Sequence, residues 1–388
     1  MFQLDDLYYR LTVTAPGMRH DLSDMLSTLL VEEDEGVPSA LDATFTDEDK
    51  TLTDALHEGI EVEVDLGTIS EHSVVFRGRV YQVDADFPHR DVSRVEVRAY
   101  DASMRMGLRR RGLARRGTLS GVVEEVAAPY AFDDIVVDLV DDPAFERNGV
   151  RQQDETDLAF LRRLAEDHGC VCFVTADNAG DRFHFQARAR LAERSPDATL
   201  RHGVGGVGRR LLRFEARSDV ADVDLRRTMS AIDYDTGKPS IETTRELEPA
   251  GGLGGLGAPA SPSLRAPLTA APGNGEVGSA RVEQLEDLLT AMPSASAALR
   301  AELGRAVPRS VPTFLGKAAL KARAANTYTS SGQGMRASGA TVGDKDLRAQ
   351  RRIEIDGVGD HFSGAWYLTG VRHRLDARGY RTDFECSR

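Results

Sequence analysis

Cysteines are few in this sequence, and long apolar segments are absent. Its 388 residues include three cysteines, Cys170, Cys172 and Cys386, and no histidine–cysteine cluster completes a metal site around them. We expect all three to be buried as small apolar side chains. No apolar run approaches the roughly 18 residues that cross a bilayer. The first ten residues, MFQLDDLYYR, are acidic and form no charged-then-apolar leader, so we expect synthesis in the cytoplasm without a signal peptide and no membrane insertion of the folded subunit.

Cationic residues are scarce in the first quarter of the chain. Residues 1–100 contain 8 Lys and Arg against 22 Asp and Glu, whereas the other residues contain 41 against 40. Phosphate binding needs clustered cations, so no direct nucleic-acid partner is expected. The acidic first region is either an ordinary solvated surface or a wall of negative charge that faces a channel or a basic neighbour.

Motifs for catalysis and cofactor binding are also missing. The stretches GVGGVG (203–208) and GLGGLG (252–257) have the G-x-G-x-x-G spacing, but neither follows a strand and opens an amphipathic helix, as dinucleotide binding requires. His361 and His373 each lie near an aspartate, which is typical of a hydrogen-bonded structural pair. No G-x-S-x-G or H-E-x-x-H occurs. We expect no catalytic residue, cofactor or metal, although a carboxylate pair that cuts cell-wall sugars is left open.

The clearest local pattern is a helix that runs into a strand over 152–174, QQDETDLAFLRRLAEDHGCVCFV. Asp154 or Thr156 can cap its amino end, and Gly169 suits the left-handed residue that closes a helix. Apolar residues at three- and four-residue spacing form one stripe with Phe160 beside it; they are Leu158, Leu161, Leu164 and Ala165. The residues after the glycine are short, apolar and typical of a strand.

The order of the elements predicts two tube-like antiparallel β-barrel domains and a smaller α+β domain. Alternating apolar and polar residues predict the first barrel over 1–103. The second barrel covers 199–388 and carries a flexible Gly/Pro-rich insertion at 249–280 and helical segments at 281–328. The α+β domain covers 104–198. The expected fold class is therefore mainly β with α+β.

An arginine-rich run opens the α+β domain. Five arginines occur in the eight residues RRRGLARR (109–116). Such a run is typical of a solvated linker; docking onto an acidic surface of a neighbouring domain or subunit is the alternative. A helix near 119–128, a β-prone run at 135–140 and a strand at 183–187 complete the domain.

Two parts of the chain share a sequence pattern. Three runs of the first barrel recur in the same order in the last segment, namely VEVDLG (62–67), FRGRVY (76–81) and VEVRAY (95–100), then IEIDGVG (353–359), FSGAWY (362–367) and TDFEC (382–386). Both copies place F-x-G-x-x-Y after an alternating strand, and a longer hairpin loop accounts for the different spacing. We infer an internal duplication in which Phe76, Gly78, Phe362 and Gly364 hold the barrel cores.

The helix segment resembles the signature Q-x-x-E-S/T-D-L-x-F-L-x-R-L-A-E-x-x-G of contractile-tail hub proteins. These are the phage late control gene D family, the valine-glycine repeat proteins of type VI secretion and the hubs of phage-like injection particles. The matching residues are Gln152, Glu155, Thr156, Asp157, Leu158, Phe160, Arg163, Leu164, Glu166 and Gly169. The last segment resembles the family's closing pattern through Gly357, Gly359, Phe362, Gly364, Trp366, Tyr367, Thr369, Val371, His373, Asp376, Gly379, Tyr380, Thr382 and Phe384.

This resemblance implies the structural hub of a phage tail baseplate or a contractile injection system. Hubs of this family form a homotrimer whose six similar barrels adapt the sixfold inner tube to the threefold spike. The implied partners are the inner tube protein, the spike and other baseplate subunits, within a tail or injection particle and without cofactor or catalysis. Many relatives continue into a needle, whereas this sequence ends at Arg388, so we expect the spike to be a separate chain.

The structural and interface candidates are the residues that these patterns single out. They are Gln152, Glu155, Asp157, Phe160, Arg163, Gly169, Phe76, Gly78, Tyr81, Phe362, Gly364, Tyr367 and Tyr380. Two alternatives stay open. One is a peptidoglycan hydrolase at a tail tip, with its carboxylates in the middle domain, and the other is a monomeric adaptor at the baseplate edge, which would not need two matched barrels.

Overall fold

The computed structural model describes most of the chain, in two compact units. The described residues are 7–15, 17–145, 149–203, 209–218, 228–232, 239–243, 312–313 and 335–388. The first unit comprises Met1–Arg217, Arg336–Gly357 and Ala365–Ser387, and the second comprises Ser218–Met335, Val358–Gly364 and Arg388. Within the described ranges, no helix combines the length and apolar character needed to cross a membrane.

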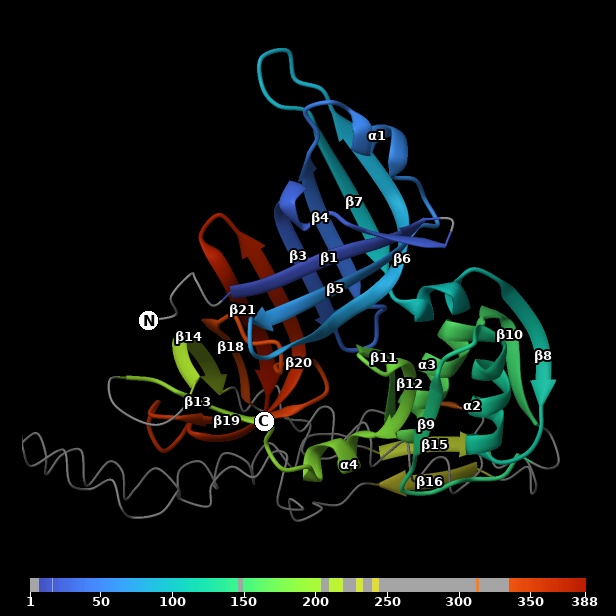
Figure 1. Cartoon of the computed structure of the whole chain (residues 1–388). Helices are drawn as coiled ribbons and strands as arrows, with labels where there is room; N and C mark the ends of the chain where they lie inside the picture. The colour runs from blue at the N-terminus through green and yellow to red at the C-terminus, as the bar shows by residue number, and fades with distance from the viewer. Residues whose placement is uncertain are drawn as a thin grey trace, which may run out of the picture. The chain divides into compact units, whose positions relative to one another are not determined.

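A curled sheet forms the first barrel of the first unit. Its elements are β1 (Leu7–Ala15), β2 (Met18–Asp21), η2 (Ser23–Met25), β3 (Leu26–Asp34), β4 (Ala40–Thr46), α1 (Thr51–Ala55), β5 (Glu61–Thr68), β6 (His72–Asp86) and β7 (Arg94–Tyr100). The strand order is β3-β4-β7-β6-β5-β1-β2, and neighbours are antiparallel. Alternate residues point inward, as in β4, where Leu41, Ala43 and Phe45 are buried. Figure 1 shows β1 and β5 crossing over β3 and β4, so that the sheet encloses one apolar core.

The α+β part of this unit packs two helices against a three-stranded sheet. Its elements are η3 (Ala102–Gly107), β8 (Arg110–Arg115), α2 (Leu119–Ala127), η4 (Ala128–Tyr130), β9 (Asp134–Asp138), β10 (Val150–Thr156), α3 (Asp157–His168), β11 (Cys170–Asp177), β12 (Gly180–Ala187) and α4 (Arg188–Glu193). Strand β12 lies between β11, which is antiparallel to it, and β9, which is parallel. Apolar side chains of α2 and α3 share a core with this sheet, and Cys170 and Cys172 belong to that core, as predicted.

The arginine-rich run is a strand and not the solvated linker that its composition suggests. Residues Arg110–Arg115 form β8, which pairs antiparallel with β10. Arg115 is buried, and its guanidinium lies 2.5 Å from the Glu125 carboxylate. The guanidinium of Arg111 lies 3.3 Å from the Asp157 carboxylate. Acidic partners in the same domain therefore hold a segment whose charge density alone predicts a loop.

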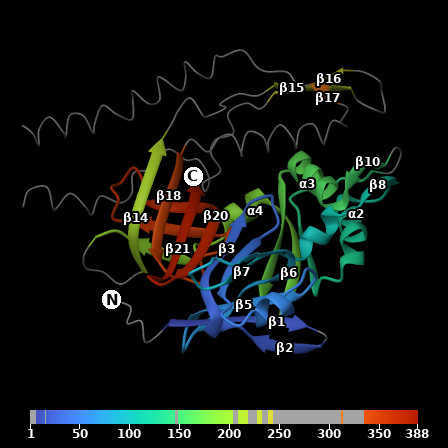
Figure 2. The same cartoon turned by 90° about the horizontal axis from the view of Figure 1, so that it is seen from above.

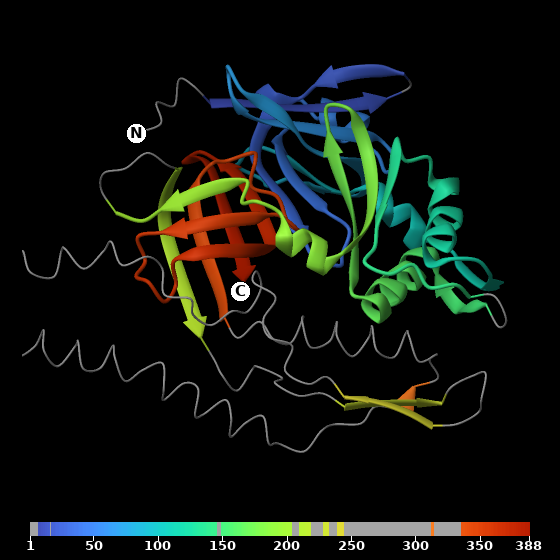
Figure 3. The same ribbon diagram turned by 90° about the horizontal axis from the view of Figure 1, so that it is seen from below.

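Six strands close into the second barrel. They are β13 (Ala198–Arg201), β14 (Arg209–Ser218), β18 (Met335–Val342), β19 (Arg352–Asp356), β20 (Gly364–Asp376) and β21 (Gly379–Ser387). The order β19-β13-β14-β18-β21-β20 returns to β19 because β19 also pairs with β20; the red and yellow-green strands of Figure 3 belong to this barrel. Strand β13 departs from the antiparallel pattern, since it runs parallel to β14 and β19. Cys386 is buried here, as predicted.

Strand β20 belongs to both barrels. One of its edges pairs with β21. Its other edge pairs first with β19 and then, over residues 370–375, with residues 29–34 of β3. One continuous sheet therefore runs in the order β14-β18-β21-β20-β3-β4-β7-β6, which can be followed in Figure 2. The predicted fold class, mainly β with two barrels and a smaller α+β part, is confirmed.

The second unit contains one small sheet among its described residues. Strand β15 (Thr228–Ile232) is antiparallel to β16 (Pro239–Thr243) and parallel to β17 (Pro312–Thr313). The predicted Gly/Pro-rich segment at 249–280 lies outside the described residues. So do the helical segments predicted at 281–328, apart from the two residues of β17.

Candidate functional site

The two barrels repeat one hydrogen-bond pattern. In the first barrel Val80 exchanges backbone hydrogen bonds of 2.7 and 2.9 Å with residues 59–60. In the second barrel Leu368 exchanges bonds of 2.9 and 2.8 Å with residues 350–351. Strand β6 therefore corresponds to β20, and Val80 to Leu368.

β-Bulges mark the same position in both copies. The register of β6 against β7 shifts between Val80 and Gln82, and that of β20 against β21 shifts between Leu368 and Gly370. A bulge is a specific feature of a strand, so two at equivalent positions support a duplication. The strands β5, β6 and β7 thus correspond to β19, β20 and β21. Strand β4 corresponds to β18, because these strands pair with β7 and β21.

This correspondence differs by two residues from the one that the sequence motif predicts. The motif sets Tyr81 against Tyr367, whereas the bulges set Tyr81 against Thr369. Phe362 lies in the turn before β20 and is only partly buried, so it does not hold a barrel core as predicted. Trp366 and Tyr367 are the buried aromatic residues of β20. Both motifs contain the same residue types, but Phe76 lies within β6, whereas Phe362 precedes β20, which begins at Gly364.

The first copy of the motif does hold a core. Phe76 is buried, and a Cβ atom at Gly78 would lie 2.2 Å from the Tyr100 carbonyl oxygen, so the strands approach closely only with glycine there. Tyr81 packs edge-on against Tyr100, with 5.7 Å between ring centroids. In the second copy, Gly364 opens β20 with a φ of +125°, which favours glycine.

The junction of β3 and β20 sets an acidic strand against a basic one. Arg372 lies opposite Glu32 in the strand register, and its guanidinium donates to the Glu32 carboxylate at 3.0 Å. The Asp34 carboxylate lies 3.4 Å from the same guanidinium. Paired charges on directly opposed residues stabilise a strand pair and favour one partner over another.

One buried arginine ties this junction to three elements. Arg348 precedes β19, and its guanidinium donates to the Glu33 carboxylate of β3 at 2.6 Å. It also donates to the Val75 carbonyl of β6 at 3.0 Å and to the Ala176 carbonyl of β11 at 3.3 Å. The Glu33 carboxylate accepts a further bond from the Ala349 amide at 3.1 Å. Burial raises the pKa of Glu33, but the charge and hydrogen bond of Arg348, together with smaller contributions from His373 and the Ala349 amide, lower that pKa below its ordinary value.

His373 is fully buried beside this ion pair. Its Nδ1 lies 2.8 Å from the Tyr380 hydroxyl. The predicted partner, Asp376, is exposed on the strand instead. Burial lowers the pKa of His373 to about 4; the Glu33 carboxylate opposes this shift and the Arg348 guanidinium adds to it. The imidazole is therefore neutral at neutral pH.

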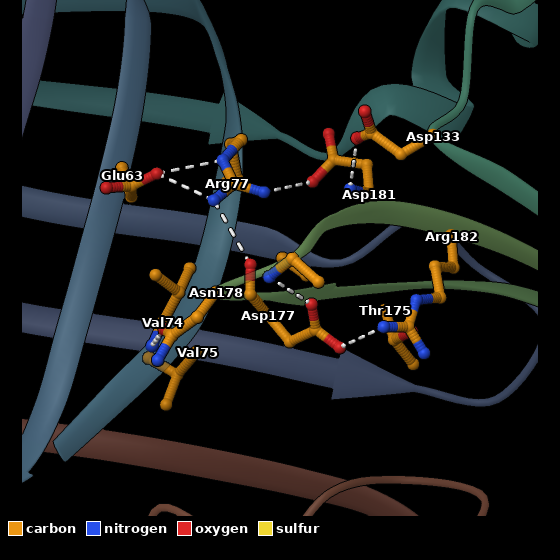
Figure 4. Close-up of polar contacts among 12 residues, drawn as sticks. Glu63, Val74, Val75, Arg77, Asp133, Thr175, Asp177, Asn178, Asp181 and Arg182 are labelled. Carbon is orange, nitrogen blue, oxygen red and sulfur yellow. Dashed lines mark hydrogen bonds and ion pairs between the residues drawn. The ribbon is translucent and has the colours of Figure 1, made fainter.

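A second polar cluster holds β6 to the hairpin of β11 and β12 (Figure 4). Arg77 donates to the Glu63 carboxylate of the first barrel at 2.8 Å and to the Asp181 carboxylate of the hairpin at 2.9 Å. The Val74 amide donates to the Asn178 side chain at 3.1 Å. Specific polar contacts therefore hold the first barrel to the α+β part.

The helix signature gathers around a buried carboxylate at the start of α3. Asp157 is 1% exposed and accepts hydrogen bonds from the Gln152 side-chain amide at 2.8 Å and from the Tyr130 hydroxyl at 2.6 Å. Arg111 supplies the opposite charge. Burial, together with the Asp157 carboxylate, raises the pKa of Tyr130 to about 12. Residues from β8, η4 and β10 are thereby fixed to α3.

The remaining signature residues complete the same segment. Arg163 donates to the Glu155 carboxylate at 2.5 Å and to the Arg151 carbonyl at 2.8 Å. Its guanidinium lies 5.3 Å from the centroid of the buried Phe160 ring. Gly169 ends the helix with a φ of +67°, as predicted.

Sequence reasoning missed the side chains that join the domains. They are Glu33, Arg77 and Arg348, which lie in the charged runs VEEDE, FRGR and LRAQRR. The one usable signal is the alternation in β3, which puts Glu33 on the inward face with the buried Leu29 and Val31. In the part of the chain that the structure describes, no three His, Cys, Asp or Glu side chains gather into a potential metal site.

Comparisons with known proteins agree with this architecture. A sequence model described as phage tail baseplate hub (GPD) matches residues 37–379. The fold resembles the tail protein from Neisseria meningitidis MC58, with a TM-score of 0.63 and 12% identity over 98% of this chain and 96% of that one. It also resembles the 43 kDa tail protein of prophage MuSo2 from Shewanella oneidensis, with a TM-score of 0.62 and 13% identity over 98% of both chains.

A type VI secretion protein shares the fold as well. The E. coli c3393 protein, a component of the type VI secretion system, has a TM-score of 0.53 and 14% identity over 93% of this chain and 73% of that one. At such identities the likeness establishes a common fold only. No curated protein sequence matches this chain.

Proposed function

The chain belongs to the phage tail baseplate hub (GPD) family, and from this premise we propose that it forms a homotrimeric ring at the centre of a contractile tail. Its role is that of a structural hub. Each copy brings two barrels of matching strand order, so three copies in a ring present six similar barrels. Such a ring adapts a sixfold inner tube on one face to a threefold spike on the other.

The matched repeat carries this proposal. The Val80 and Leu368 strands share their hydrogen-bond partners and the position of their bulge. A monomeric adaptor has no need of two barrels with equal strand order, and a cell-wall hydrolase gains nothing from them. A ring of three chains, each with two equivalent barrels, explains why such a repeat is present.

We propose domain limits that fall within a few residues of the strand ends. The first barrel is assigned to 1–103, the α+β domain to 104–198 and the second barrel to 199–388; β7 ends at Tyr100 and β13 begins at Ala198. The α+β domain projects from the ring toward the spike. The signature residues around Asp157 set the shape of this domain, and the motif around Gly78 sets the shape of the first barrel.

The partners in this proposal are the inner tube protein, the spike and other baseplate subunits. The hub is incorporated into a phage tail or a phage-derived injection particle and acts sterically, by nucleating the tube on one face and holding the spike on the other. Its role is structural and not enzymatic.

The native mass of the purified protein tests the ring. A trimer of 42.3 kDa chains has a mass of about 127 kDa by light scattering and should show a ring with a central hole by negative staining. A 42.3 kDa species that persists when the spike is co-expressed would contradict the ring. Clearing of a purified peptidoglycan suspension would instead favour the hydrolase.

A further inference from the structure

A cavity of about 590 Å³ lies between the start of β1 and the tip of the hairpin that β20 and β21 form. Leu7 opens β1, Leu212 lies on β14, and most of the remaining lining comes from residues 374–383 of the hairpin. All of these residues belong to the first unit. A cavity of this size is large enough to bury several side chains of a ligand. The polar clusters described above leave it unused.

The floor of the cavity is apolar. Leu7 and Tyr380 are partly buried and pack against the core of the first barrel. The Tyr380 ring is fixed, because its hydroxyl lies 2.8 Å from Nδ1 of His373 and a Cβ atom at Gly343 would lie only 2.0 Å from the ring. Leu212 is 47% exposed at the cavity wall. Apolar side chains of an occupant would therefore remove further apolar surface from water here.

The hairpin gives the cavity an excess of positive charge. Three arginines and two aspartates of the hairpin line it. The Asp383 carboxylate lies 3.2 Å from the Arg374 guanidinium and 2.6 Å from that of Arg381. The Asp376 carboxylate accepts a hydrogen bond from the backbone amide of Arg378 at 2.7 Å. The Arg378 guanidinium has no acidic partner among the residues that the structure describes, so it is available to a carboxylate of an occupant.

The sequence directly before Leu7 has the chemistry that this cavity fits. Residues 1–6 read MFQLDD, with three apolar residues followed by two aspartates. The apolar residues suit the floor, and the aspartates supply the charge opposite to that of Arg378. Because Leu7 itself lines the cavity, the stretch begins at the cavity wall, and six residues reach at most about 20 Å. A ligand tethered so closely has an effective concentration on the order of millimolar.

We propose that the cavity binds residues 1–6 of the same chain, with their apolar side chains against Leu212 and Tyr380 and their carboxylates beside Arg378. The inference is independent of the proposed ring. It adds a second link between the barrels, because β1 belongs to the first barrel and the β20–β21 hairpin to the second. This link lies apart from the pairing of β3 with β20.

Cysteine cross-linking in the full-length chain tests the occupant. Leu4→Cys with Leu212→Cys should form a disulfide within one chain, detected by mass spectrometry of the digested protein. Leu4→Cys with Leu113→Cys is the matched control, because Leu113 of β8 is also 47% exposed but does not line the cavity. The three native cysteines are buried and add little background. Equal linkage in the two variants, or a disulfide that joins two chains, would overturn the proposal.

Peptide competition tests the chemistry of the cavity. The probe is a synthetic MFQLDD peptide with a dye at its carboxyl end, and its binding is followed by fluorescence anisotropy. The full-length variant Phe2→Ser with Leu4→Ser should bind the peptide at least about tenfold more tightly than the wild type, whose own segment competes for the cavity. Equal binding to the two proteins, or no binding to the variant, would overturn the proposal.

Charge reversal at the rim completes the test. Arg378→Glu, added to the Phe2→Ser and Leu4→Ser variant, should weaken peptide binding by at least about fivefold, because it replaces an attraction with a repulsion. Arg116→Glu in the same background is the control, since Arg116 is an exposed arginine that does not line the cavity. An equal loss from both arginine substitutions would show that the peptide responds to net charge only, and would overturn the site.

Discussion

Glu33 and Arg348 form an ion pair inside the protein at 2.6 Å, although 315 positions separate them in the chain. Glu33 lies on β3 of the first barrel, and Arg348 precedes β19 of the second. Both side chains are buried, and each supplies the opposite charge that offsets the desolvation free energy of the other. The pair therefore fastens the two barrels beside the strand that they share.

Removing one partner should be costly. Arg348→Met leaves the Glu33 carboxylate buried and unpaired, and we expect the free energy of unfolding to fall by about 3–5 kcal/mol. Urea unfolding, followed by the fluorescence of the single buried tryptophan, Trp366, measures this change. The double variant Glu33→Gln with Arg348→Met is the control, because it removes both charges and should recover most of the loss. A loss below about 1 kcal/mol in the single variant would contradict this view of the pair.

Acid should weaken the protein through His373. Its pKa is about 4 in the folded state and 6.5 without burial, so between these values the unfolded chain binds a proton that the folded chain does not. Stability is therefore complete above pH 6.5 and falls by about 3 kcal/mol as the pH drops to 4. Unfolding of the wild type and of His373→Gln across this range checks the prediction. Parallel curves for the two proteins would show that another group is responsible.

Gly78 should tolerate no side chain. The Cβ atom of Gly78→Ala would meet the carbonyl oxygen of Tyr100, which belongs to the backbone of β7 and cannot rotate away. We expect a loss of about 1–3 kcal/mol in unfolding free energy. Gly112→Ala is the matched control, because no heavy atom lies within 4 Å of its added Cβ, and it should change stability by less than about 0.5 kcal/mol. Equal stability of the two variants would argue against tight packing at Gly78.

The buried Asp157 carboxylate should contribute strongly to the stability of the α+β domain. In Asp157→Ala, the Gln152 amide and the Tyr130 hydroxyl lose their buried acceptor, so we expect a loss of about 2–4 kcal/mol. Chemical denaturation gives the size of the loss, and limited proteolysis should show faster cleavage near β10. Asp141→Ala, at an exposed position, should behave as the wild type in both assays. If Asp157→Ala resists denaturant and protease as well as the wild type does, the signature residues do not stabilise the domain through this carboxylate.

Local patterns predicted the elements well because their causes lie within a few residues. The start of α3 at Thr156 and its end at Gly169 depend on a hydroxyl cap and a left-handed glycine, and both are visible in the sequence. Alternation likewise predicted the strands of the first barrel.

Long-range pairing limited the rest. The arginine run became β8 because Asp157 and Glu125 approach it from other elements, which no local window contains. The shared motif revealed the repeat, but it aligned the two copies two residues away from the structural correspondence. That correspondence depends on the positions of the β-bulges, which the residue composition does not show. The role of Arg348 was not predicted because its three acceptors lie on β3, β6 and β11, which are far from it in the sequence.

Sharing β20 between two barrels also decides how the molecule carries force. The hydrogen bonds of antiparallel pairs lie perpendicular to the strands. A pull along β20 therefore loads its bonds to β21 and β3 together, in shear, and does not peel them one at a time. Because the two barrels are joined by this strand and not by a flexible tether, thrust on one barrel passes to the other without a hinge that could absorb it.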